Sequence, residues 1–135
     1  MPGPKVFFDT NILLYLLSSD TGKADRAEAI MQTGGLISVQ VLNEVTNVGR
    51  RKLSMSRPEI DEFLSLIQSV LTVKSLTLDT YNKGRYVAER YGLSVYDSMI
   101  VAAALIGECD ILYSEDMHNG LLVDDQLHIC NPFVS

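Results

Sequence analysis

The fold of this chain is decided by VFFDTN at residues 6–11, where three apolar residues are followed by three polar ones. A compact apolar run of this kind predicts a short buried strand that ends on Asp9. Thr10 or Asn11 can then cap a helix that begins at Ile12. That helix is apolar on all sides, so we expect it to be buried on most of them.

Beyond this stretch, short apolar runs alternate with longer amphipathic segments. Further strands are predicted at residues 36–38, 72–76, 111–113 and 127–130, the last as an edge strand. Helices are predicted at about 23–32, 39–52, 78–91 and 94–107, and the capping-box pair Ser56 and Glu59 opens one more. Such alternation is typical of an α/β fold built on a parallel sheet.

Length and composition predict one ordinary globular domain over residues 1–135. The chain has 47% hydrophobic and 21% charged residues, and neither a repeat nor a Pro/Gly-rich linker divides it. Its apolar runs are shorter than the roughly 20 residues that cross a bilayer, and no signal-peptide pattern opens it. We therefore expect a cytoplasmic protein, in which Cys109 and Cys130 are reduced core residues.

Four acidic residues are candidates for a site. Asp9 and Asp116 follow predicted strands, Glu44 lies in the helix after the second strand, and Asp97 lies in the first turn of a helix that follows a loop. In open parallel sheets, ligands bind outside the carboxyl ends of the strands, so these acids are candidates for one site. Converging carboxylates repel one another unless one is protonated or a cation lies between them. Oxygen ligands without His or Cys favour Mg²⁺ or Mn²⁺ over zinc. One or two such ions can activate water and stabilise the leaving oxygen in phosphodiester hydrolysis.

Three of these acids also have a purely structural interpretation. Asp9 could simply begin a turn. Glu44 could be an exposed residue at the border of the apolar stripe of its helix. Asp97 follows Ser94 at capping-box spacing, where the helix dipole favours an acid. Capping and metal binding are nevertheless compatible, because a carboxylate has two oxygens.

The fourth acid has a competitor beside it. Glu115 directly precedes Asp116, so either residue could supply the carboxylate. Period-two alternation beyond the strand places Asp116 on the same side as Ser114. This alternation favours Asp116.

Four motifs in order make the chain resemble the PIN domains, and specifically the VapC-type toxin nucleases of bacterial and archaeal toxin–antitoxin pairs. The motifs are VFFDTN at 6–11, SVQVLNE at 38–44, YDSMIVAAA at 96–104 and LYSEDM at 112–117. The sequence NPF at 131–133 is typical of one branch of these proteins. The resemblance covers essentially the whole chain.

This resemblance implies a three-layer α/β/α fold with a central, mainly parallel sheet and Mg²⁺- or Mn²⁺-dependent cleavage of RNA. It also implies a homodimer in many cases, and inhibition by a small antitoxin whose C-terminal segment commonly wraps the toxin and reaches its acidic site. Asn11 and Ser114 would orient carboxylates or metal-bound water. The metal-binding and catalytic acids would be Asp9, Glu44, Asp97 and Asp116.

The net charge of −6 by itself argues against a nucleic-acid partner. If part of that charge is a metal site, the acidity becomes a reason to expect cations. The densest basic cluster is Arg50, Arg51 and Lys52, at the end of a predicted helix. It is either a solvated helix end favoured by the dipole or a contact for RNA phosphates.

Other functions fit the residues less well. A haloacid-dehalogenase-type phosphatase needs a second Asp two residues after the first, where this chain has Asn11. A response-regulator receiver needs adjacent early acids and a late Lys after a strand, which Phe8, Asp9 and Ser114 do not offer. A catalytically silent PIN scaffold that binds RNA or protein remains an alternative, against which the complete acid set argues.

Overall fold

Within residues 3–134, which the computed structural model describes, six short strands form one sheet in the order β3-β2-β1-β4-β6-β5. The central strand β1 (Val6–Phe8) pairs in parallel with β2 (Leu36–Ser38) and β4 (Ile111–Tyr113). β3 (Thr72–Lys74) and β6 (Leu127–Cys130) extend the parallel sheet outward. The two-residue β5 (Leu122–Val123) pairs with β6 in antiparallel fashion.

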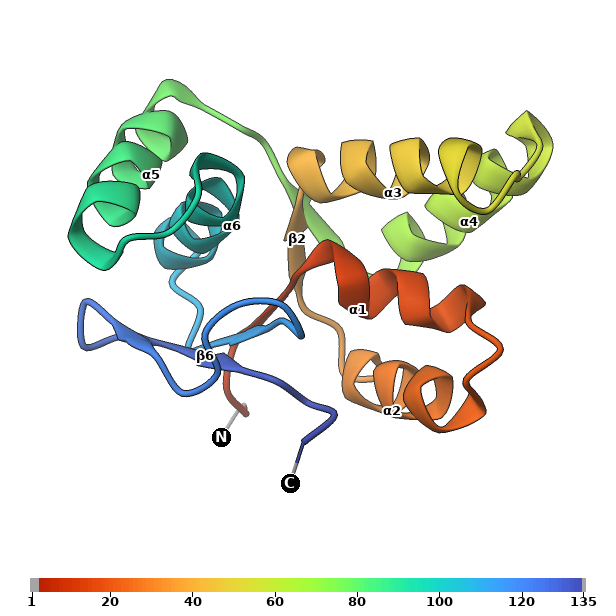
Figure 1. Cartoon of the computed structure of the whole chain (residues 1–135), viewed down its shortest axis with the longest axis horizontal. Coiled ribbons are helices and arrows are strands. Elements are labelled where there is room, and N and C mark those ends of the chain that lie inside the picture. The colour runs from red at the N-terminus through yellow and green to blue at the C-terminus, as the bar shows by residue number, and fades with distance from the viewer. Residues whose placement is uncertain (1–2, 135) are drawn as a thin grey trace.

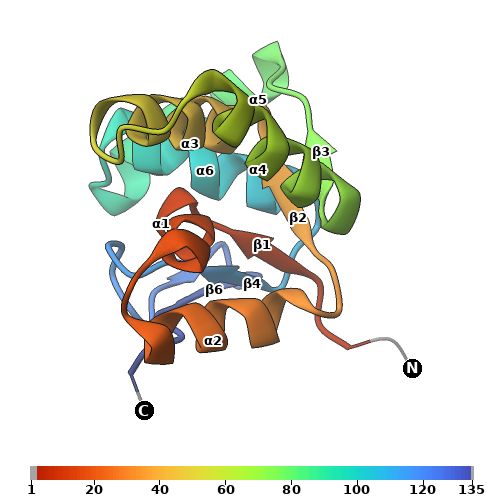
Figure 2. The same cartoon turned by 90° about the vertical axis from the view of Figure 1, so that its right-hand side faces the viewer.

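Helices cover both faces of this sheet (Figures 1 and 2). One face carries α1 (Thr10–Leu14), its 3-10 continuation η1 (Tyr15–Leu17), α2 (Thr21–Met31), α3 (Val39–Arg51) and α4 (Arg57–Val70). The other face carries α5 (Leu78–Tyr91) and α6 (Val95–Ile106). The predicted fold class, a three-layer α/β/α arrangement around a mainly parallel sheet, is confirmed.

Two sequence predictions about element positions are wrong. The first helix begins at Thr10 rather than Ile12, because Asp9 is its N-cap and accepts a hydrogen bond from the Thr10 backbone N at 2.7 Å. Residues 127–130 are not at the sheet edge, since β5 lies outside them. β5 has only two residues and follows no apolar alternation, so the sequence gives little sign of it.

Local signals set most other helix ends correctly, although α2 begins at Thr21 behind its N-cap Asp20 rather than at about residue 23. Ser56 and Glu59 form the predicted capping box of α4, and Gly92 ends α5 in the left-handed conformation. The core lies between the sheet and both helix layers, and fully buried side chains from the strands fill it: Phe7, Phe8, Ile37, Leu112, Leu127 and Ile129.

The two cysteines are free, as predicted, although only Cys109 is fully buried and Cys130 is half-buried. Among the described residues, no helix is both long and apolar enough to span a membrane.

Close packing of β1 against the turn before β2 makes Gly35 sensitive to substitution. Its φ is +151°, and an added Cβ would lie 2.6 Å from the Phe8 ring and 3.0 Å from the Val6 carbonyl oxygen. Because the Phe8 ring is buried, we expect Gly35→Ala to lower the free energy of unfolding by about 2–4 kcal/mol, measured by urea denaturation.

Gly22 in α2 supplies the matched control. Its added Cβ would meet only Asp20 Oδ1 at 3.6 Å, and alanine is a better helix former than glycine. Gly22→Ala should leave the free energy of unfolding unchanged or raise it by up to about 1 kcal/mol. Equal stability of the two variants would contradict the packing described at Gly35.

Candidate active site

The carboxylate of Asp9 lies at the carboxyl end of the central strand, with only 7% of the residue exposed. Oδ1 accepts from the Thr10 backbone N at 2.7 Å, and Oδ2 accepts from Ser114 Oγ at 2.8 Å. Burial, and secondarily the negative charges of Glu44 and Asp97, raise the pKa of Asp9 from 3.8 to about 6, although the two hydrogen bonds act in the opposite direction. Asp9 therefore lies within the electrostatic range of two other acids.

Glu44 reaches the same edge from α3. It is half-buried, and its Oε2 accepts a hydrogen bond from the hydroxyl of Thr10, the residue next to Asp9. Gln40, one turn earlier in α3, donates to Glu44 Oε1 at 3.5 Å and to the Tyr96 carbonyl oxygen at 3.2 Å. The start of α3 is thus tied both to α1 and to the start of α6.

Asp97 lies in the first turn of α6 and is half-buried. Its backbone N donates to Ser94 Oγ at 3.2 Å, so Ser94 caps the helix. Within residues 3–134, the Asp97 carboxylate does not accept the reciprocal bond from the Ser94 backbone N that would complete a capping box. Its carboxylate therefore remains available at the edge it shares with Asp9.

Asp116 is exposed and is held by one side chain. Asn11 Nδ2 donates to Asp116 Oδ2 at 3.0 Å, and Asn11 Oδ1 accepts from the Glu115 backbone N at 3.2 Å. A cavity of about 320 Å³ opens beside this amide, lined by Asn11, Leu14, Tyr15, Leu17, Ser18, Val48, Leu53, Glu115 and Asp116.

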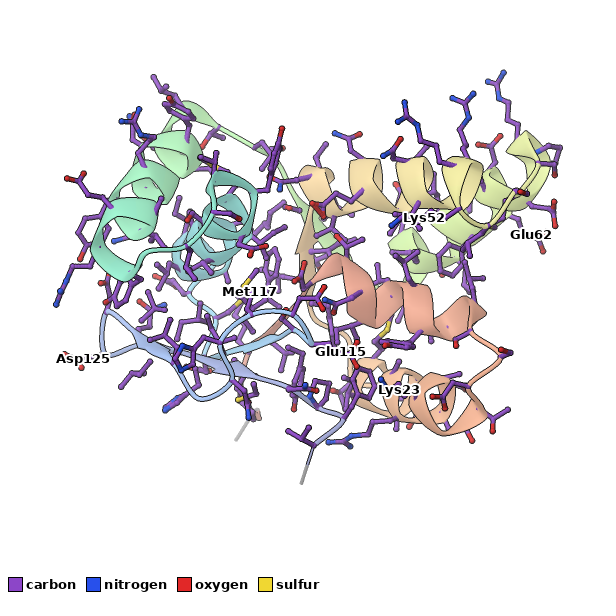
Figure 3. The ribbon with its side chains drawn as sticks, in the orientation of Figure 1. Lys23, Lys52, Glu62, Glu115, Met117 and Asp125 are labelled. Atoms are coloured by element: carbon purple, nitrogen blue, oxygen red, sulfur yellow. The ribbon has the colours of Figure 1, made fainter. Side chains whose placement is uncertain are left out.

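The side chain of Glu115 has other partners. It accepts hydrogen bonds from Tyr15 Oη and from Lys23 Nζ, the latter at 2.6 Å as an ion pair (Figure 3). Both carboxylate oxygens are therefore engaged away from Asp9. Of the two neighbouring acids, Asp116 is the one whose carboxylate contacts Asn11.

The oxygen chemistry of the four acids fits a hard divalent cation. Such an ion would also favour the ionised form of Asp9, whose pKa is raised first by burial and then by the charges of Glu44 and Asp97. Among residues 3–134, however, no three acidic, His or Cys side chains lie close enough together to hold an ion as they stand. Metal binding would therefore require the side chains of these acids to move toward one another.

The basic cluster lies at the carboxyl-terminal end of α3. Arg50 and Arg51 occupy its last turn and Lys52 follows, and all three are exposed. No ion pair involves any of the three in the described part of the chain.

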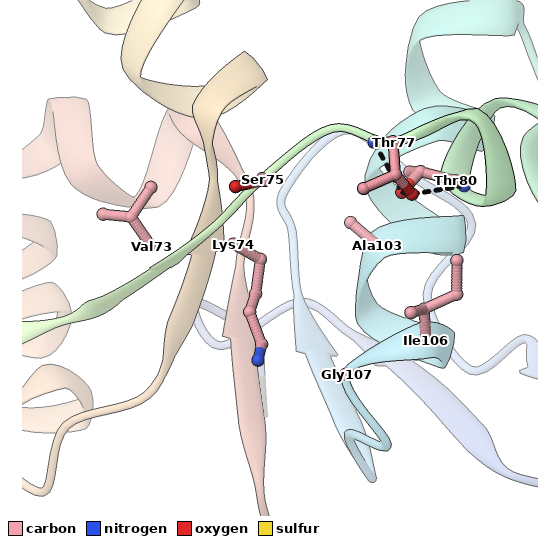
Figure 4. Close-up of a pocket in the computed structure, with 8 residues that line it drawn as sticks. All are labelled: Val73, Lys74, Ser75, Thr77, Thr80, Ala103, Ile106 and Gly107. Carbon is pink, nitrogen blue, oxygen red and sulfur yellow. Dashed lines mark hydrogen bonds between the residues drawn. The ribbon is translucent and has the colours of Figure 1, made fainter.

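A second hollow, of about 380 Å³, lies between the end of β3 and α6 (Figure 4). It has no acidic lining residue, and its Thr77 and Thr80 hydroxyls are hydrogen-bonded to each other at 3.1 Å. This hollow therefore lacks the carboxylates that are present at the edge of the sheet around Asp9.

Three contributors to this region were not identified from the sequence: the Thr10 hydroxyl, Tyr15 and Lys23. Thr10 was available as a possible cap, but nothing local indicates that its hydroxyl reaches a helix 34 residues away. Tyr15 and Lys23 meet Glu115 across 100 and 92 residues, and such contacts become visible only in the folded chain.

Solved structures share this architecture. A toxin–antitoxin complex from Klebsiella pneumoniae matches with a TM-score of 0.74 and 19% identity, covering 96% of this chain and 98% of that one. VapC20 of Mycobacterium tuberculosis, described as a Sarcin-Ricin loop cleaving toxin, matches with a TM-score of 0.65, 18% identity and coverage of 83% and 90%. VapBC2 of Rickettsia felis, bound to a promoter DNA fragment, matches with a TM-score of 0.60, 20% identity and coverage of 82% and 87%.

At these identities the structural matches establish the fold alone. No curated protein matches the sequence significantly. The PIN-domain family model, in contrast, matches residues 6–118, which contain all four acids. The chain belongs to the PIN-domain family.

Proposed function

We propose that this protein is an Mg²⁺- or Mn²⁺-dependent endoribonuclease that hydrolyses RNA phosphodiester bonds, and that it is the toxin of a toxin–antitoxin module. The metal-binding and catalytic residues would be Asp9, Glu44, Asp97 and Asp116. The observation that carries the proposal is the buried Asp9 carboxylate, which lies within the field of two further acids at the carboxyl edge of the sheet.

A metal ion bound there would supply an activated water and stabilise the leaving oxygen. The residues of the chain prepare that position. Ser114 and the Thr10 backbone N fix the two oxygens of Asp9, and the Thr10 hydroxyl holds Glu44. Asn11 orients Asp116. Such supporting hydrogen bonds typically account for about ten- to hundredfold in metal affinity or activity.

RNA is the proposed substrate, in line with the family resemblance and with one structural relative that is described as a Sarcin-Ricin loop cleaving toxin. Arg50 and Arg51 belong to the same helix as Glu44, and Lys52 follows that helix directly. Leu53, next to Lys52, lines the cavity that also contains Asp116. A strand of RNA could thus contact the basic cluster with its phosphates while a scissile bond lies near the acids.

An antitoxin is the proposed partner, because one structural relative that covers 96% of this chain is a toxin–antitoxin complex. An apolar groove of about 570 Å³ between η1, α2 and α4 gives such a partner a place to bind. It is lined by Leu16, Leu17, Glu28, Met31, Gln32, Phe63, Leu66, Ile67 and Val70. Three residues of this lining are exposed, Leu17 (39%), Leu66 (57%) and Val70 (44%), and adjoining exposed apolar side chains are typical of interaction sites.

We also propose a homodimer acting in the cytoplasm. Large apolar side chains are exposed near the starts of α5 and α6, notably Leu78 and Tyr96, each 73% exposed. A second copy would cover them. Analytical ultracentrifugation at micromolar concentration should show twice the monomer mass.

Removing the charge of Asp9 should abolish cleavage. With purified protein, Mn²⁺ and RNA whose new ends are sequenced, we expect Asp9→Asn to lower the cleavage rate by at least about a hundredfold. The control Asp25→Asn makes the same charge change on the exposed face of α2 and should retain full activity. Full activity of Asp9→Asn would refute the assigned site, whereas RNA binding without cleavage by the wild type would indicate a silent scaffold.

The same substitution should stabilise the metal-free fold. Burial raises the pKa of Asp9 from 3.8 to about 6, so ionisation of Asp9 costs the folded protein free energy relative to the unfolded chain, and this cost is fully present above pH 6. In EDTA at pH 7.5, Asp9→Asn should therefore unfold with a free energy about 3 kcal/mol higher than that of the wild type. The difference should shrink as the pH falls through 6 and vanish near pH 4, where Asp9 is protonated in the folded protein. A difference that does not vary with pH would contradict the raised pKa.

A charge in the apolar groove should block neutralisation but not cleavage. We expect Leu66→Glu to arrest growth on expression even when the product of the neighbouring antitoxin gene is present, because a carboxylate there opposes apolar contact. Leu122→Glu, on the edge strand β5 and 39% exposed, is the matched control and should still be neutralised. Neutralisation of both variants would show that the groove is not the antitoxin site.

A further inference from the structure

Glu115 lies in sequence between two residues of the proposed site, yet its carboxylate faces elsewhere. Ser114 on one side contacts Asp9, and Asp116 on the other is held by Asn11. Lys23 Nζ lies 2.6 Å from Glu115 Oε2, and these two side chains point toward one another in Figure 3. The Tyr15 hydroxyl donates to Glu115 Oε1. This pairing fixes the loop after β4 against η1 and α2.

The backbone of Glu115 transmits that constraint to Asn11. The Glu115 N–H donates to Asn11 Oδ1 at 3.2 Å, and the amide nitrogen of Asn11 donates to Asp116 Oδ2 at 3.0 Å. An amide has its acceptor and its donors on opposite sides. The bond from Glu115 therefore determines which side of Asn11 faces Asp116.

The cation of this pair is held by aromatic rings. Lys23 Nζ lies 4.8 Å from the centre of the Tyr15 ring and 5.3 Å from that of Phe133, and the two rings meet edge to face at 4.8 Å. Arg26 Nε donates to the Pro132 carbonyl oxygen at 3.0 Å, which fixes the segment that carries Phe133. Contacts with both rings restrict an otherwise flexible ammonium group.

We propose that Lys23, Tyr15 and Glu115 are positioning residues for Asp116. They hold the loop after β4 so that Asn11 presents its NH₂ group to the Asp116 carboxylate. Asp116 is exposed, and without this support its side chain would sample several rotamers, so fewer molecules would present it to a cation at any moment. The proposal rests on the proposed function, because it assigns a role around one of the four acids.

The chain contains a matched ion pair far from this loop. Lys83 Nζ lies 2.9 Å from Asp124 Oδ2, with side chains 36% and 23% exposed, against 35% and 23% for Lys23 and Glu115. The ammonium group of Lys83 also lies over a tyrosine ring, 4.7 Å from the centre of the Tyr86 ring. Two tyrosine hydroxyls donate hydrogen bonds to the Asp124 carboxylate. This ion pair links α5 to the β5–β6 turn and contacts none of the four acids.

The experiment compares Lys23→Met with Lys83→Met in the full chain. Mn²⁺ affinity is measured by electron paramagnetic resonance, and RNA cleavage is resolved into kcat and KM. We expect Lys23→Met to weaken Mn²⁺ binding and lower kcat by about tenfold each, with KM unchanged. Lys83→Met should change each value less than twofold, and Lys23→Arg, which keeps the charge, should restore most of the loss.

A measurement on the metal-free protein tests whether Lys23 positions the side chain of Asn11. The side-chain amide resonances of Asn11 in ¹H–¹⁵N spectra should shift in Lys23→Met and stay unchanged in Lys83→Met. Equal Mn²⁺ affinity, equal kcat and unshifted Asn11 resonances in Lys23→Met would overturn the proposal and leave the nuclease function standing. A change in KM alone would likewise overturn it, since Lys23 would then contact RNA directly. A wild-type protein that neither binds Mn²⁺ nor cleaves RNA would instead refute the proposed function.

Discussion

The burial of the Asp9 carboxylate constrains the arrangement of everything around it. A charged group with 7% exposure at the end of the central strand needs donors close by, and they come from two places: the backbone of α1 and the hydroxyl of Ser114 after β4. These contacts fix the start of α1 and the loop beyond β4 relative to β1. Glu44 is linked to this group because it accepts a hydrogen bond from the Thr10 hydroxyl. Gln40 in turn donates to a backbone carbonyl at the start of α6, which links α3 to that helix.

Under the proposed function, the burial of Asp9 lowers the stability of the metal-free fold at the position where a cation would bind. Domains are stable by only about 5–15 kcal/mol, so a buried carboxylate disfavoured by about 3 kcal/mol at neutral pH is a substantial cost. Hydrogen bonds from Ser114 and the Thr10 backbone N offset part of it. A divalent cation, if bound there as proposed, would offset the remainder and would account for a carboxylate at a position where a neutral residue is expected to give a more stable fold.

Local patterns in the sequence were sufficient for the order of the elements and for most helix ends, because capping boxes, glycines and apolar runs act within a few residues. These patterns did not predict β5, which has two residues and depends on pairing with β6. They also placed the N-cap of the first helix at Thr10 or Asn11, whereas the N-cap is Asp9. The four acids were selected from two kinds of position, after a strand for Asp9 and Asp116 and within a helix for Glu44 and Asp97, together with the resemblance to PIN domains, and their roles stay a prediction. The partners of Glu115 could not be selected in this way, since Tyr15 and Lys23 reach it only through tertiary contacts.

The central claim is that the edge around Asp9 is a divalent-cation site. The most direct measurement is a ¹³C NMR titration of the Asp9 carboxyl carbon, performed without metal and again with saturating Mg²⁺. Burial and the neighbouring acids predict a pKa of Asp9 near 6 in the metal-free protein, and the added cation should lower that pKa. A pKa of Asp9 near 3.8 that Mg²⁺ leaves unchanged would contradict the account.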